Sequence, residues 1–146
     1  MPVKIAPNQI QNPQQIEAIV TGPEDANRLF VIDGQFDAGV FAGSQGAGFV
    51  QQKETFSVLI GPVLTRKQFC RAIATASLAK TSFSINATPA NFGWQILSVD
   101  ADWDDESGQV ELRIEAAANC SGQNNNSQIN GFIFHVTILA AIAAEQ

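Results

Sequence analysis

The stretch from Asn91 to Ala141 constrains this chain most strongly, because its side chains alternate in character over two successive runs. From residue 94 to 104, small polar and carboxylate side chains occupy nearly every second position. After the acidic turn at residues 105–108, the alternation resumes as far as Ala118. Period two is the spacing of a β-strand, and a glycine-containing turn between two such runs is typical of a hairpin. A third strand is predicted to follow an Asn/Ser-rich loop, at residues 119–130, and to end near Ala141.

The rest of the chain adds further expected strands. Short strands are predicted at residues 16–20 and 28–32, a longer strand at residues 49–60, and another at residues 81–86. The glycine-dense stretch at residues 33–48 does not have the spacing of a phosphate-binding loop, and a strand rather than a helix follows it. We therefore expect its glycines to supply turns, bulges or a surface loop.

One helix is predicted over residues 65–80. Thr65 is a favourable N-cap and Gln68 completes a capping box. Apolar side chains then recur at helical spacing and form one face that could pack on a sheet, at Phe69, Ala72, Ile73, Ala76 and Ala79. The expected fold is therefore mainly β: an antiparallel β-sandwich or curled sheet with one α-helix. The alternatives are a partly closed barrel, or an α+β sheet with the helix on one face.

Length and composition indicate one β-rich domain at residues 16–146, preceded by a polar arm at residues 1–15. The chain has 146 residues, of which 45% are hydrophobic, and this is enough to bury a core. The arm is rich in Pro, Gln and Asn, and ordering it costs about 1–2 kcal/mol per residue in backbone entropy. Docking its apolar side chains on a neighbouring subunit would offset this cost, which makes Val3, Ile5 and Ile10 interface candidates.

Charge argues against a nucleic-acid partner. The formal net charge is −6, and residues 81–146 carry eight acidic residues but only Arg113 as a base. Such a surface repels phosphate backbones. We also expect no membrane partner, because no signal peptide is visible and the most apolar run, at residues 132–144, is too short to span a bilayer. The protein is expected to be made in the cytoplasm, with incorporation into a particle left open.

The acidic hairpin is the only metal candidate. Asp100, Asp102, Asp104 and Glu111 occupy positions one, three, five and twelve of a calcium-loop count. Asp105, however, stands where that loop needs glycine, and the flanking segments have strand rather than helix periodicity. We therefore expect no dedicated metal site and at most weak calcium binding.

The hairpin also has a predicted register. Placing Trp103 opposite Val110 keeps the apolar residues of both strands on one face. Asp102 then lies opposite Glu111, and Asp100 lies opposite Arg113.

The last predicted strand, at residues 132–139, is apolar on both faces. It is either central and covered on both sides, or it uses one face against another subunit. We therefore name Ile133, His135 and Leu139 as further interface candidates. His135 is the only histidine, which excludes a multi-histidine metal site within one chain. A nucleophile pair with Cys70 or Cys120 has no local support, so no catalytic or cofactor-binding residue is assigned.

Three classes of function remain open. The leading hypothesis is a non-enzymatic structural protein that self-assembles or decorates a larger assembly, such as a viral capsid, a phage tail or a phage-tail-like particle. Ten Phe and no Tyr favour burial and subunit contacts over ligand recognition. The alternative is a binding module that uses the acidic hairpin or the Asn-rich loop for a partner protein or calcium. An enzyme with dispersed active-site residues is the third class.

Overall fold

Two four-stranded sheets make up the computed structural model, which describes residues 2–21, 26–46 and 48–142. One sheet, sheet A, has the strand order β1-β4-β7-β6, and the other, sheet B, has the order β2-β3-β8-β5. The described strands are β1 (Val3–Ile5), β2 (Ile10–Thr21), β3 (Ala26–Gly43), β4 (Val50–Ile60), β5 (Phe69–Ser84), β6 (Asn91–Trp103), β7 (Val110–Ser121) and β8 (Asn126–Ala140). A short 3-10 helix, η1 (Pro7–Gln9), joins β1 to β2.

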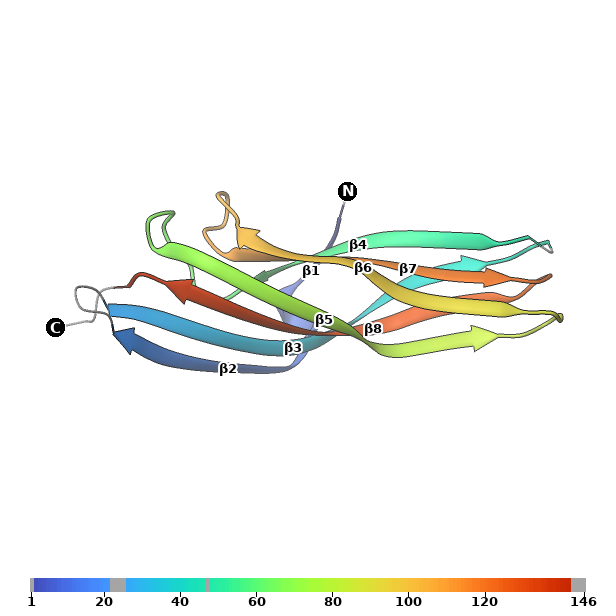
Figure 1. The fold of residues 1–146 in the computed structure, drawn as a ribbon, viewed down its shortest axis with the longest axis horizontal. Helices are drawn as coiled ribbons and strands as arrows, with labels where there is room; N and C mark the ends of the chain where they lie inside the picture. Colours follow the sequence, from blue (N-terminus) through green and yellow to red (C-terminus); the bar gives the residue numbers. More distant parts are fainter. Residues whose placement is uncertain (1, 22–25, 47, 143–146) are drawn as a thin grey trace.

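The sheets pack face to face as an elongated sandwich, with strands that run along its length (Figure 1). All strand pairs are antiparallel except β1 with β4, which is parallel. The prediction of a mainly β, sandwich-like fold is confirmed. The predicted hairpin register is also confirmed, because Trp103 pairs with Val110 and Asp100 pairs with Arg113.

Phenylalanine fills the space between the sheets. Phe36, Phe56, Phe132 and Phe134 are at most 2% exposed. The ring centroids of Phe36 and Phe132 lie 5.3 Å apart, and those of Phe56 and Phe132 lie 5.2 Å apart. These separations are typical of packed aromatic pairs, so much of the Phe-rich composition serves the core.

The predicted helix at residues 65–80 is wrong, because residues 69–84 form strand β5. The capping-box hydrogen bonds do form: Thr65 N–H donates to Gln68 Oε1 at 2.9 Å, and Gln68 N–H donates to Thr65 Oγ1 at 3.3 Å. They stabilise a single turn that does not continue. Ile73, placed by the helix prediction on the buried face, is 57% exposed.

Tertiary pairing explains this outcome. β5 pairs with β8 along almost its whole length, from Phe69 opposite Ala140 to Ser84 opposite Asn126. Its sequence also has period two, since Ala72, Ala74, Ala76 and Leu78 are partly buried against the core while the residues between them are exposed. The helix propensity of alanine is a weak preference that a full strand partner overrides.

The glycine-dense stretch is mostly strand rather than loop. β3 extends to Gly43, and its register with β8 shifts between Asp37 and Val40, around Gly39. Gly34 is needed for close packing, because a Cβ there would lie 2.7 Å from the Phe134 ring and 2.9 Å from Ile10. The expectation of a bulge is met at Gly39.

The polar arm folds back on its own domain. Its residues 3–5 form β1 beside β4, and residues 10–15 are the first half of β2. Ile5 is only 7% exposed and packs in the core of its own chain, so its assignment as an interface residue stays a prediction. Ile10 packs against the same core, whereas Val3 is 43% exposed.

Candidate functional site

The residues considered for nucleophilic catalysis lie apart. His135 is on the solvent side of β8 and pairs with Thr75 of β5. Cys120 is buried in β7, where its sulfur contacts the carbonyl oxygens of Ala42 and Asn125 at 3.4 and 3.5 Å. Cys70 is exposed near the start of β5, and both thiols are free. No three His, Cys, Asp or Glu side chains in the described ranges are placed to hold a metal ion together.

The acidic hairpin uses its carboxylates internally. Asp104 Oδ2 accepts hydrogen bonds from Ser107 N–H at 3.0 Å and from the Ser107 hydroxyl at 2.6 Å. These bonds lower the pKa of Asp104 below its usual value. Asp102 accepts a bond from the N–H of Trp103, and Glu111 pairs with Arg113 Nε at 2.6 Å. The four calcium candidates therefore do not converge on one point.

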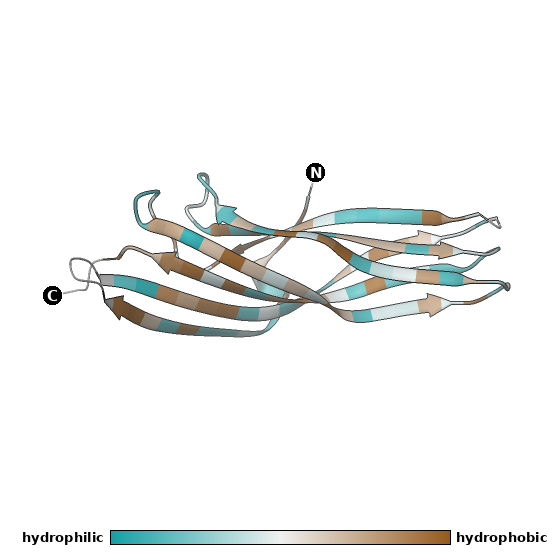
Figure 2. Ribbon diagram, viewed as in Figure 1, coloured by the Kyte–Doolittle hydropathy of each residue, from teal (hydrophilic) through white to brown (hydrophobic). Residues whose placement is uncertain are grey.

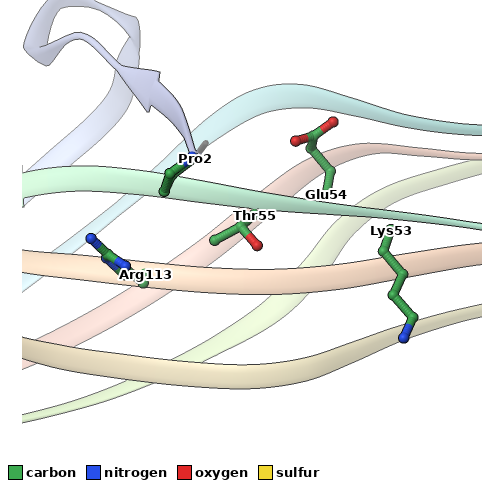
Figure 3. A pocket seen from close by; sticks show the side chains of 5 residues that line it. All are labelled: Pro2, Lys53, Glu54, Thr55 and Arg113. Carbon is green, nitrogen blue, oxygen red and sulfur yellow. The ribbon is translucent and has the colours of Figure 1, made fainter.

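A groove of about 420 Å³ lies beside this hairpin, between β1, β4 and β7. Its lining combines Lys4 with three acidic side chains and the nearly buried Ser57. A second hollow, of about 260 Å³, lies further along sheet A (Figure 3). Its Lys53, Glu54 and Arg113 side chains point in different directions (Figure 3). Neither hollow presents the convergent set of polar groups that catalysis needs.

The Asn-rich loop also bonds to its own chain. Asn125 is fully buried. Its Oδ1 accepts from the N–H groups of Asn86 and Ala87, and its Nδ2 donates to the carbonyls of Ala87 and Ser121. This side chain therefore joins the β5–β6 and β7–β8 connections, which gather at one end of the sandwich (Figure 1).

The remaining candidate is the face of sheet B that points away from the core. Phe30 and Ile32 of β3 and Val136 and Ile138 of β8 point inward, so the residues between them point outward. We call the outward set the outer face. From β2 it contains Ile16, Ala18 and Val20; from β3, Leu29, Val31 and Asp33; from β8, Ile133, His135, Thr137 and Leu139; and from β5, Arg71, Ile73 and Thr75.

Apolar residues run across this face in rows. Paired residues on neighbouring strands point to the same side, and one row reads Ile16, Val31, Thr137, Ile73. The next row reads Ala18, Leu29, Leu139, Arg71. Figure 2 shows the corresponding apolar segments of β2, β3, β5 and β8 in the half of sheet B where β2 and β8 end. Ile16 is 67% exposed and Ile73 is 57% exposed, and no part of the described chain covers them.

A contact between the side chains of His135 and Asp33 borders the apolar rows. His135 Nδ1 contacts Asp33 Oδ1, and these side chains are 56% and 38% exposed. Three predicted interface residues, Ile133, His135 and Leu139, thus share the outer face. Prediction from sequence missed Asp33, Ile16 and Ile73 on this face. The alternation of Ile16, Ala18 and Val20 was a visible signal for a strand with one apolar face.

No helix in the described residues is long and apolar enough to cross a membrane. A scan against protein-family models, a search of curated proteins and a search of solved structures each returned no match.

Proposed function

We propose that this protein is a non-enzymatic structural protein that self-assembles through the outer face of sheet B. The observation that carries the proposal is the exposed apolar surface on both sides of the central pair β3–β8, with Ile16 at one edge and Ile73 at the other. Monomeric proteins rarely expose contiguous apolar patches larger than a few hundred Å².

Strand β8 carries apolar side chains on both of its faces, which supports the same proposal. Its inward residues, such as Phe134 and Val136, fill the core, while its outward residues Ile133 and Leu139 are half-buried and remain partly open to solvent. If only water contacted the outward side of these positions, polar residues would be suitable there. The apolar residues therefore favour contact with another protein surface. An assembly of many copies, such as a viral capsid, a phage tail or a phage-tail-like particle, is the setting that we propose.

The test is the oligomeric state of the purified protein. We expect light scattering after size exclusion to give a mass above that of one chain, and Ile73→Lys to reduce that mass by placing a charge in the contact. Val63→Lys is the matched control, because Val63 is 71% exposed in the connection between β4 and β5 and lies outside the outer face.

Circular dichroism should show that both variants keep the β-sheet spectrum of the parent protein. A parent protein that remains a monomer at high concentration would overturn the proposal. An equal effect of the two lysine substitutions would overturn the assignment to the outer face.

A further inference from the structure

The apolar, acidic and histidine side chains of the outer face are arranged so that this face can pack against the same face of a second copy. Their arrangement also specifies the orientation of the two copies. We infer that a second copy of this chain docks on the outer face of sheet B, with a two-fold axis parallel to the strands and between β3 and β8. This inference rests on the proposed function and deepens it by naming the partner and the geometry. Closed two-fold dimers are the commonest assemblies of identical chains.

The axis places β2 of one copy over β5 of the other, and β3 over β8. In the first apolar row, Ile16 then faces Ile73 of the second copy, and Val31 faces Thr137. In the next row, Leu29 faces Leu139, and the small Ala18 faces the long Arg71. Ile16 thus meets Ile73 and Ala18 meets Arg71 at the rim, while Leu29 meets Leu139 in the middle, so side chains of the two stacked sheets can interdigitate.

The charges select this axis over the other two-fold axis that lies in the plane of the face. Asp33 and His135 occupy the same row on adjacent central strands. With the axis parallel to the strands, each Asp33 faces the His135 of the second copy, so each carboxylate meets an imidazole and not another carboxylate.

An axis perpendicular to the strands gives a poorer match. It sets Asp33 against Asp33 when it passes through that row. When it passes through the row of Val31, it sets Asp33 against Leu29. The first case sets two carboxylates against each other, and the second buries the Asp33 carboxylate against apolar side chains at a desolvation cost.

The area of the face is close to that of a standard contact. All four strands lie side by side only along residues 26–36 of β3, because β2 pairs with no other part of β3. At about 3.3 Å per residue and about 4.8 Å between strands, this four-stranded part has a footprint of about 700 Å². A standard interface uses about 800 Å² on each partner.

Cysteine crosslinking tests the geometry. In a Cys70→Ser background, which removes the exposed native thiol, a tagged Ile16→Cys chain and an untagged Ile73→Cys chain are mixed and treated with a short bis-maleimide reagent. Stacked sheets lie about 10 Å apart, which such a reagent spans. We expect a crosslinked product that contains one chain of each kind, and little product from either chain alone.

Each outcome has a distinct meaning. Crosslinking of Ile16→Cys chains to one another, in a protein that sizes as a dimer, would overturn this axis in favour of a β2–β2 contact and would leave the proposed function intact. A protein that sizes as a monomer and forms no crosslink would overturn both. A Val63→Cys chain mixed with the Ile73→Cys chain is the control for random collision, and its product sets the background above which the expected product must rise.

Discussion

Asn125 and Ala87 bond to each other through both polar groups of the asparagine side chain. The Ala87 N–H donates to Asn125 Oδ1, and Asn125 Nδ2 donates to the Ala87 carbonyl, each at 3.0 Å. The amide thus imitates the two hydrogen bonds of a paired strand residue. Because Asn125 also bonds to Asn86 and Ser121, one buried side chain fixes two connections that are distant in sequence.

We therefore expect Asn125→Ala to destabilise the fold by about 2–4 kcal/mol, because it leaves buried backbone donors and acceptors without partners. Urea unfolding followed by circular dichroism measures the change. Gln123→Ala, at an exposed position in the same loop, is the matched control and should be within about 0.5 kcal/mol of the parent. Equal stability of the two variants would show that the Asn125 bonds contribute little.

The two tryptophans provide a second comparison. Trp103 Nε1 donates to the carbonyls of Leu64 and Gly108, at 3.0 and 3.1 Å. Trp94 Nε1 is buried and has no acceptor among the described residues. Trp103→Phe should cost about 1–3 kcal/mol, because the Leu64 carbonyl loses this donor.

Trp94→Phe should cost less, since it removes a donor that has no partner. Thermal and urea melts of both variants give the order of stability. The reverse order would contradict the role assigned to the Trp103 bonds.

Gly34 tests how tightly the sheets pack. A Cβ at this position would lie within 3 Å of both Phe134 and Ile10. We expect Gly34→Ala to lower the free energy of unfolding by about 1–3 kcal/mol through overpacking. Gly46→Ala is the control, because nothing lies within 4 Å of the added atom, and it should leave the midpoint of unfolding nearly unchanged.

Asp104 provides a pH test. Its hydrogen bonds to Ser107 lower its pKa in the folded protein, so the carboxylate stabilises the fold above its unfolded pKa of about 3.9, and this contribution is lost as the pH falls through the folded value. Asp104→Asn should therefore be less stable than the parent near neutral pH. The gap should close in urea melts between about pH 5 and about pH 2, and a gap that stays constant over that range would contradict this reading.

Local patterns predicted the β6–β7 hairpin down to its register. The alternation on both strands and the short turn specify which residues face each other, from Trp103 opposite Val110 onward. The same kind of local evidence failed at residues 65–80, where a real capping turn at Thr65 precedes a strand. A capping-box sequence predicts only the hydrogen bonds of one turn. The structure of the sixteen residues of β5 depends instead on pairing with β8, which lies much later in the chain.

The candidate site could be predicted only in part. Ile133, His135 and Leu139 were found because one strand is apolar on both faces. Asp33 was not found, because its contact with His135 joins residues 102 positions apart, and no local pattern specifies such a pairing. Ile73 was assigned to the wrong surface because its strand was predicted as a helix.

The position of β8 between β3 and β5 also sets the order in which this chain folds. Sheet B cannot be completed until β8, a strand of 15 residues and the last in the chain, is present between β3 and β5. The β6–β7 hairpin of sheet A, in contrast, needs only residues that are close in sequence. Topologies dominated by distant pairings fold slowly, in milliseconds to seconds. A chain emerging from the ribosome therefore holds β3 and β5 without their common partner β8, and we expect a nascent chain that stops before Asn126 to bind chaperones that the finished protein does not need.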